Sequence, residues 1–295
     1  MPFGSIDRRK FIRLTTAAGA AALAVDSTLI EPNRPRVVQQ KIALPRWPAR
    51  LDGFTIALLS DFHYDPYCSV HPLKAAIPLV NALHPDLIVL TGDFVSVPLF
   101  ATNPEVGAAS AEPCANLLSQ LRAPNGLWAV MGNHDYFTDA EHVTSALRAE
   151  GIRVLANASV AIEPNEARFW LAGVNDVLSG TAELDVTLQE VERDEATILL
   201  AHEPDYADYV ARNPAQGKHA VDLQLSGHSH GGQVRLPFLP PLYLPELAKK
   251  YVAGLFKIGS LTLYTNLGLG TVGVPVRWNC PPEITMITLR RSYPG

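Results

Sequence analysis

The sequence predicts an α/β protein with one functional site at an edge of a β-sheet. Three short apolar runs, at residues 54–59, 86–90 and 127–131, have the length and composition of buried β-strands, and polar residues follow each run immediately. Helix-like patterns at residues 73–83 and 112–121 lie between these runs. Because the carboxyl ends of strands in an α/β sheet form the usual binding edge, we expect these polar residues to share one site.

The second half of the chain continues this pattern. Residues 168–172, 197–201 and 221–225 are predicted to be strands, and the last two again lead directly into polar residues. Two further apolar runs, at residues 261–265 and 284–289, are predicted to be the last strands of the chain. The residues alone therefore support an α/β fold with a single site.

The composition is that of a globular protein. Of the 295 residues, 47% are hydrophobic and 18% are charged. The 24 basic and 29 acidic residues give a net charge of −5, and there is no basic stripe, so a nucleic-acid partner is not expected. Cys68, Cys114 and Cys280 lack the C-x-x-C spacing of a zinc cluster and allow at most one internal disulfide.

The polar residues that follow the predicted strands form five clusters. Each cluster contains carboxylate, imidazole or amide side chains, which are the usual protein ligands of transition metals. A single D-x-H or G-N-H motif would carry little weight, but five such clusters in a fixed order are specific. In chain order the clusters are Asp61-Phe62-His63, Gly92-Asp93, Gly132-Asn133-His134-Asp135, His202 and Gly227-His228-Ser229-His230.

In this order the clusters resemble the calcineurin-like metallophosphoesterase superfamily, and the resemblance covers residues 54–290. The segments 227–233, 268–270 and 281–285 are similar to the exported bacterial branch that includes YkuE-type phosphodiesterases. The resemblance implies the metallophosphoesterase fold, a four-layered αββα sandwich with two central mixed β-sheets. It also implies a metal-dependent hydrolase of phosphoric esters.

The resemblance further implies a binuclear centre of two divalent metal ions. Asp93 would bridge the ions, because a carboxylate has two oxygens that can each face one cation. Mixed imidazole and oxygen ligands favour Mn, Fe or Zn over Ca. By family correspondence one ion would be held by Asp61, His63, Asp93 and His230, and the other by Asp93, Asn133, His202 and His228.

The implied chemistry is attack on phosphorus by a metal-activated hydroxide. Two divalent ions and two carboxylates leave a net positive centre, which attracts phosphate and stabilises charge in the transition state. By resemblance His134 stabilises the scissile phosphate or protonates the leaving group. Asp135 is expected to orient the His134 imidazole, because a carboxylate partner fixes the tautomer of a histidine.

The favoured function is that of a phosphodiesterase or pyrophosphatase that acts on an envelope or lipid-linked substrate. A phosphomonoesterase or protein phosphatase with the same metal core is an alternative. A non-catalytic metal-binding scaffold is a remote alternative, because it predicts losses among the ligands or at His134, and the sequence has none.

Residues 1–25 resemble a twin-arginine-type export signal. Arg8 and Arg9 precede an apolar run of small residues at 14–25, which is too short for a comfortable membrane span. Cleavage after Ala24 and retention as an anchor both remain open. The resemblance implies the twin-arginine export machinery as a partner, and a location in the periplasm, the cell wall or the outer face of the cytoplasmic membrane.

Residues 26–50 contain four prolines and are predicted to be a tether, which leaves residues 51–295 as the metallophosphoesterase catalytic domain. Within that domain, residues 234–256 combine leucines and aromatic residues with four prolines and follow the last predicted ligand directly. This segment is either a loop packed on the sheet or an apolar surface that contacts a membrane or receives a lipid-linked substrate.

Overall fold

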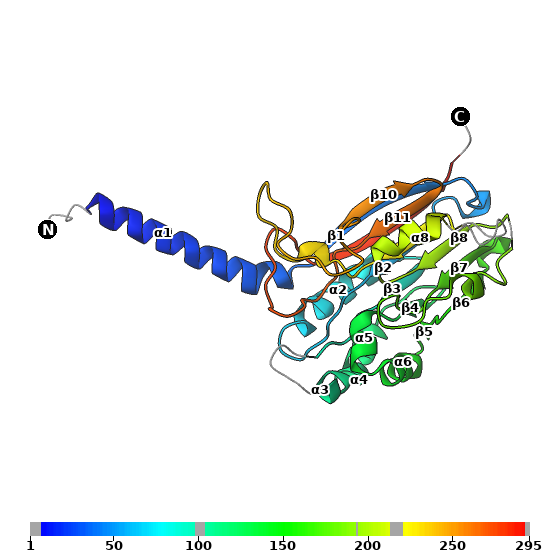
Figure 1. Cartoon of the computed structure of the whole chain (residues 1–295), viewed down its shortest axis with the longest axis horizontal. Coiled ribbons are helices and arrows are strands. Elements are labelled where there is room, and N and C mark those ends of the chain that lie inside the picture. Colours follow the sequence, from blue (N-terminus) through cyan, green and yellow to red (C-terminus); the bar gives the residue numbers. More distant parts are fainter. Residues whose placement is uncertain (1–6, 98–103, 193, 213–220, 293–295) are drawn as a thin grey trace.

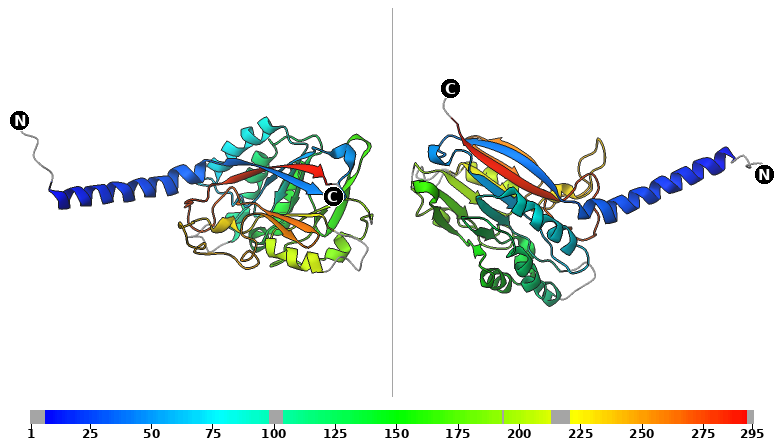
Figure 2. Two further views of the ribbon diagram at one scale, coloured as in Figure 1. Left: turned by 90° about the horizontal axis from the view of Figure 1, so that it is seen from above. Right: turned by 180° about the vertical axis from the view of Figure 1, so that it is seen from behind.

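The computed structural model describes residues 7–97, 104–192, 194–212 and 221–292. Two six-stranded β-sheets pack face to face, and helices cover their outer faces (Figures 1 and 2). The four-layered αββα sandwich with two central mixed sheets is thereby confirmed. The sheets are mixed because each combines parallel strands at its centre with an antiparallel pairing nearer an edge.

The first sheet has the strand order β1-β12-β2-β3-β4-β5. Its strands β2 to β5 are parallel, β12 runs antiparallel to β2, and β1 runs parallel to β12. The three central parallel strands are therefore the ones whose carboxyl ends can share a site. The bounds are β1 (Arg36–Leu44), β2 (Thr55–Leu59), β3 (Leu87–Thr91), β4 (Leu127–Val130), β5 (Arg153–Val154) and β12 (Glu283–Arg291).

The second sheet has the strand order β10-β11-β9-β8-β7-β6. Strands β7, β8, β9 and β11 run parallel to one another, whereas the edge strands β6 and β10 run antiparallel to β7 and β11. The bounds are β6 (Ala158–Ile162), β7 (Phe169–Gly173), β8 (Thr197–Leu200), β9 (Leu223–Ser226), β10 (Gly254–Ile258) and β11 (Leu261–Thr265).

The helices are divided between the two outer faces. Helices α2, α4 and α6 pack on the first sheet, and α7 and α8 pack on the second. Helices α3 and α5 lie beside the loops at the strand ends. The bounds are α1 (Arg8–Val25), α2 (Val70–Leu83), α3 (Pro104–Ala108), α4 (Ala111–Leu118), α5 (Asn133–Thr138), α6 (Ala140–Ala149), α7 (Leu184–Thr187) and α8 (Ala207–Arg212).

The central strands are apolar along their whole length because both of their faces are covered. In β2, Ile56 and Leu58 point into the core between the sheets, whereas Ala57 and Leu59 point toward the helices. Continuous apolar runs are expected of strands buried on both sides. The core also holds the thiols of Cys114 and Cys280, and all three cysteines of the chain are free.

The prediction of a tether over residues 26–50 is wrong for most of that segment. Residues 36–44 form β1, which pairs with β12 from the other end of the chain. Trp47 is fully buried, and Arg46 makes an ion pair of 2.8 Å with Asp222. The segment folds because it completes an edge of the first sheet, so the folded domain begins before residue 51.

Helix α1 projects from the body of the protein, and every residue of it is exposed (Figure 1). Within the described part of the chain, no helix has both the length and the apolar character needed to cross a membrane. The export signal over residues 1–25 stays a prediction.

Candidate metal centre

The five predicted clusters come together at one end of the two-sheet sandwich. Three follow strands β2, β3 and β4 of the first sheet, and two follow β8 and β9 of the second. The predicted site at the carboxyl ends of the strands is therefore built from both sheets. The side chains of its carboxylates and ligand histidines are almost completely buried, namely Asp61, His63, Asp93, His202, His228 and His230.

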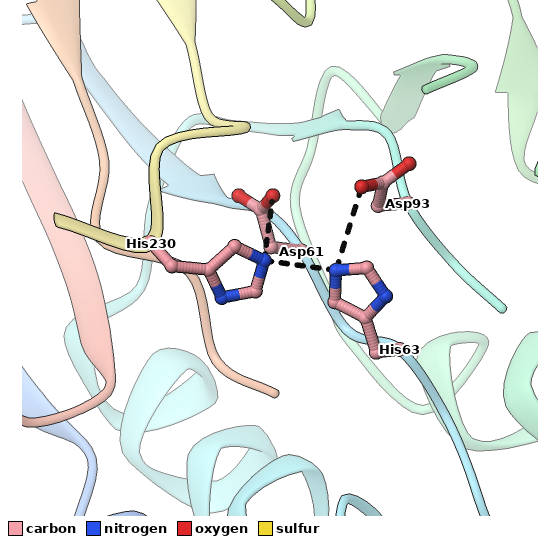
Figure 3. A group of neighbouring side chains, drawn as sticks. All are labelled: Asp61, His63, Asp93 and His230. Atoms are coloured by element: carbon pink, nitrogen blue, oxygen red, sulfur yellow. Dashed lines mark hydrogen bonds and ion pairs between the residues drawn. The ribbon is translucent and has the colours of Figure 1, made fainter. Parts of the chain in front are cut away.

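One group of ligands consists of Asp61, His63, Asp93 and His230 (Figure 3). The Nε2 atoms of His63 and His230 lie 2.9 Å apart, and His230 Nε2 lies 3.3 Å from Asp61 Oδ1. His63 Nε2 is also 3.4 Å from Asp93 Oδ2. Two imidazoles and two carboxylates that point at one place form a donor set that suits a transition metal.

A second group of ligands consists of Asp93, His202 and His228. His202 Nε2 lies 3.2 Å from Asp93 Oδ2 and 3.2 Å from His228 Nδ1. Asp93 belongs to both groups, as expected of a bridging ligand. The chain thus holds two adjacent buried Asp/His groups, consistent with a binuclear metal site.

The two carboxylate oxygens of Asp93 have different partners. Its Oδ2 atom faces both His63 and His202, whereas its Oδ1 atom accepts a hydrogen bond of 2.9 Å from the backbone amide of His134. Asp93 Oδ2 therefore lies next to one histidine of each ligand group. The helical turn that begins at Asn133 takes up the other oxygen.

Backbone carbonyls fix which nitrogen of two histidines faces the metal positions. His202 Nδ1 lies 2.6 Å from the carbonyl oxygen of Thr91, and His228 Nε2 lies 2.8 Å from that of Glu246. Because a carbonyl can only accept, each of these nitrogens carries the proton. In the neutral form of each ring the opposite nitrogen keeps its lone pair, the arrangement usual for histidines that bind metal.

Asn133 and His134 face the same region from the start of α5. The side-chain oxygen of Asn133 is buried and has no hydrogen-bond partner among the residues that the structure describes, which fits an oxygen that a cation would satisfy. His134 is half-buried, and its ring packs edge-on against His63 with a centroid distance of 4.8 Å. Both residues line a cavity beside the ligands.

The expected pairing of Asp135 with the His134 imidazole is wrong. Both carboxylate oxygens of Asp135 accept hydrogen bonds from backbone amides, at distances of 2.8–3.1 Å. Asp135 therefore ties the loop after β3 to the loop after β4 and acts through the backbone. Burial and the nearby charge of Asp93 raise the pKa of Asp135 to about 8. The four amide donors belong to Asp93, Phe94, Val95 and Gly132.

Five of the predicted ligands have a left-handed backbone conformation, which is unusual for residues other than glycine. Each lies in the loop shortly after a strand, where its side chain belongs to one of the two ligand groups. Such conformations cost about 1–3 kcal/mol each and are concentrated at functional sites. The φ angles are 52° at Asp61, 40° at His63, 56° at Asp93, 67° at His228 and 48° at His230.

Burial changes the acidity of the ligands. It lowers the pKa of His63 to about 3 and that of His228 to about 4, so these imidazoles are neutral and can donate a lone pair. Burial also raises the pKa of Asp61 to about 6. A carboxylate that is costly to ionise in isolation is stabilised when a cation binds beside it.

Arg277 is a residue of the site that sequence reasoning missed. Its side chain is fully buried, and one guanidinium nitrogen lies 3.5 Å from His230 Nδ1. Its other partners are the backbone carbonyls of four residues, so it holds the loop behind His230 in place. An isolated arginine gives no pattern that predicts this role. The four carbonyls belong to Leu267, Gly268, Gly270 and Cys280.

Two cavities are lined in part by the ligands. The first has a volume of about 490 Å³ and is lined by Asn133, His134, His228 and His230. The second has a volume of about 450 Å³ and is lined by His63 together with polar and apolar side chains from other loops. Gly273 lines both cavities, so the two cavities adjoin at this residue.

The segment at residues 234–256 divides into two parts. Leu242 and Tyr243 line the first cavity while remaining largely exposed to solvent. Ala248 and Tyr251 are buried, and Tyr251 packs in the core between the second sheet and helices α7 and α8. The segment is therefore a packed loop in its second part and an exposed apolar surface in its first.

The fold and the buried metal-ligand groups define a metal-dependent phosphoesterase, and the chain belongs to the calcineurin-like phosphoesterase family. The match to that family covers residues 54–232. The chain is 33% identical to the metallophosphoesterase YkuE of Bacillus subtilis (strain 168), with 97% of this chain and 99% of that protein aligned.

Two further relatives carry names that state an activity. The chain is 32% identical to the phosphodiesterase YaeI of Escherichia coli (strain K12), with 96% of this chain and 99% of that protein aligned. It is 27% identical to the UDP-2,3-diacylglucosamine pyrophosphatase LpxG of Chlamydia trachomatis, with 93% of this chain and 95% of that protein aligned.

Proposed function

We propose that this chain hydrolyses a phosphodiester or pyrophosphate bond in an envelope or lipid-linked substrate. The observation that carries the proposal is a pair of cavities that both reach the metal ligands, one lined by Asn133, His228 and His230 and the other by His63. A diester or pyrophosphate has a substituent on each side of the reacting phosphorus, whereas a monoester has only one. Two cavities of about 490 and 450 Å³ provide a place for each substituent.

The proposed ligands divide as the geometry suggests. Asp61, His63, Asp93 and His230 would hold one divalent ion, and Asp93, Asn133, His202 and His228 would hold the other. When bound, Mn, Fe or Zn ions would supply positive charge for the phosphate and an activated water for the attack.

His134 is the proposed proton donor or phosphate ligand. Its ring lines the first cavity beside the ligands but belongs to neither of the two ligand groups. Its backbone amide is bound to Asp93 Oδ1, which fixes the start of α5 and hence the place from which the imidazole extends. In this position it can protonate the leaving oxygen of a phosphate bound between the cavities.

The first cavity favours an apolar substituent. Leu242, Tyr243, Val272 and Val274 line it opposite the ligand histidines. One relative is named as a pyrophosphatase of a diacylated sugar nucleotide, which combines a lipid and a pyrophosphate in one molecule. A lipid-linked substrate would place its acyl portion on this side.

We further propose that the chain is exported by a twin-arginine-type signal. Support comes from Arg8 and Arg9 at the start of α1 and from the apolar residues that follow. The proposed location is the periplasm, the cell wall or the outer face of the cytoplasmic membrane.

The test compares a diester with a monoester on the same full-length protein. The chain is stripped of metal, reloaded with Mn and assayed with bis-p-nitrophenyl phosphate and with p-nitrophenyl phosphate. We expect higher kcat/KM for the diester and loss of both activities in Asp93→Asn. Turnover of the monoester alone would refute the diesterase and favour a phosphomonoesterase.

A cavity-filling variant makes the test specific to the two-sided site. Val106 lines the second cavity and Val274 lines the first, and both side chains are about half exposed. We expect Val106→Trp and Val274→Trp each to raise KM for the diester while leaving metal binding intact. Unchanged diester kinetics in both variants would contradict the use of the two cavities.

A further inference from the structure

An exposed apolar loop follows the last metal ligands. We call residues 236–243 the apolar loop; they are Leu, Pro, Phe, Leu, Pro, Pro, Leu and Tyr, with no charged residue. Phe238 is fully exposed, with 105% relative accessibility, and has a left-handed φ of 66°. Tyr243 is 72% exposed. Contiguous large apolar side chains on a surface mark an interaction site.

The apolar loop is continuous with the base of α1. Leu242 and Tyr243 line the first cavity together with Val272 and Val274, and Gln233 bonds to the backbone of residues 272 and 274. Thr271 and Pro275, in the same short segment, line a further cavity of about 320 Å³ together with Leu29 and Pro32. The segment 271–275 thus lies between the apolar loop and residues 28–33, which follow α1 in the chain.

Helix α1 leaves the protein at this same end. Figures 1 and 2 show that α1 and the loops before β10, coloured yellow to orange, project from one end of the body, away from strands β5 and β6. The apolar side chains of α1 are exposed, including Phe11, Leu14, Leu23 and Val25. The helix contains no acidic residue, and its basic residues gather in its first six positions.

We propose that this end of the molecule docks on an anionic lipid bilayer. The apolar loop would insert Phe238 and Leu239 among the acyl chains, and α1 would place its apolar part in the same bilayer. Basic residues beside an apolar helix are attracted to anionic headgroups, which favours a lipid surface over a second protein. Because α1 and the apolar loop both expose apolar residues at one end of the molecule, they define how the protein is oriented on the bilayer.

This orientation makes the mouth of the first cavity face the bilayer. Leu242, Tyr243 and Val274 line this cavity and are all more than half exposed to solvent. A lipid-linked substrate would reach the metal ligands along apolar side chains without crossing water. This consequence rests on the proposed function, whereas the docking itself does not.

The docking is tested with a fluorescent reporter in the apolar loop of the full-length chain. Phe238→Trp is bound to vesicles of phosphatidylglycerol and acyl-brominated phosphatidylcholine, and its emission is compared with that of the wild type under the same conditions. Bromine on the acyl chains quenches tryptophan that enters the bilayer. Val186→Trp is the matched control, because Val186 is 50% exposed on α7 at the outer face of the second sheet.

We expect strong quenching of Trp in the apolar loop and none at position 186. Equal quenching at the two positions, or no quenching at either, would overturn the proposal. Helix α1 alone can hold the chain on vesicles, so binding by itself does not show that the apolar loop enters the bilayer. Only stronger quenching at position 238 than at position 186 shows this.

A second variant measures the contribution of the loop to binding. Phe238→Ser combined with Leu239→Ser removes two apolar side chains that do not line the first cavity. We expect the vesicle partition coefficient to fall roughly tenfold or more and the turnover of a water-soluble diester to stay unchanged. An unchanged partition coefficient would overturn the proposal. An inactive chain that still shows the quenching contrast would refute the proposed function and leave the docking surface intact.

Discussion

Asp135→Asn separates a structural role of this carboxylate from a catalytic one. The carboxylate of Asp135 accepts four backbone amides, two on each oxygen. In the asparagine variant one oxygen becomes an NH₂ group, so two buried amides lose their acceptor and face another donor. Each unsatisfied buried donor costs about 1–3 kcal/mol, so the expected loss of unfolding free energy is about 4 kcal/mol.

The assay is thermal unfolding of the metal-free protein, together with kcat of the Mn-loaded enzyme across pH. For a chain of this size the loss corresponds to a Tm lower by roughly 6–8 °C. Asp139→Asn is the matched control, because Asp139 is exposed and its carboxylate caps the amide of His142, a role that asparagine fills nearly as well. We expect its Tm to be unchanged.

The result that would refute this reasoning is an Asp135→Asn variant with unchanged Tm and a shifted pH profile of kcat. That outcome would mean that Asp135 sets the protonation of His134 in solution, as the sequence first suggested. A lower Tm with an unshifted pH profile supports the role as a backbone clamp.

Three further changes probe other parts of the site. His134→Asn should lower kcat for the diester by roughly 10²–10⁴ while Mn binding, measured by calorimetry, stays unchanged; weakened Mn binding would show that His134 is a ligand. Lysine at position 277 can reach fewer of the four backbone carbonyls that Arg277 binds, so most of them lose their donor. Arg277→Lys should therefore lower the unfolding free energy, measured in a denaturant titration, by about 2–4 kcal/mol. A variant as stable as the wild type would contradict the role of Arg277 in holding this loop. Burial raises the pKa of Asp61 to about 6, so below that pH a proton competes with the metal for this carboxylate. The affinity for Mn should therefore fall at least tenfold between pH 7.5 and pH 5.0. An affinity that stays constant over this range would contradict ligation by Asp61.

Glycine at position 227 allows a further check of the packing. A Cβ atom there would collide with Ser60 Oγ and Asp61 Oδ2. Gly227→Ala should therefore displace the loop after β9, lower the unfolding free energy by about 1–3 kcal/mol and weaken Mn binding. A variant with native stability and native Mn affinity would show that the loop relaxes freely.

The sequence predicted the central strands well because their physical signal is local. Residues 56–59 and 87–90 are apolar at every position since both of their faces are covered, and such runs differ clearly from the loops that follow. Strand β1 was missed because its burial is mixed and its partner β12 lies at the other end of the chain. Pairing over that separation leaves no mark in a single sequence.

At the metal site, too, features with a local sequence signal could be predicted, whereas features that depend on long-range contacts could not. The clusters of Asp and His could be predicted because metal binding demands particular side chains shortly after each strand. The roles of Asp135 and Arg277 could not, since both act on backbone groups whose positions depend on the complete fold.

The most direct test of a binuclear phosphodiesterase is a titration of the metal-free, full-length chain with Mn while hydrolysis of bis-p-nitrophenyl phosphate is followed. Two ligand groups that share Asp93 predict that turnover reaches its maximum at two ions per chain and is lost in Asp93→Asn. A maximum at one ion per chain, or turnover that needs no metal, would contradict the account.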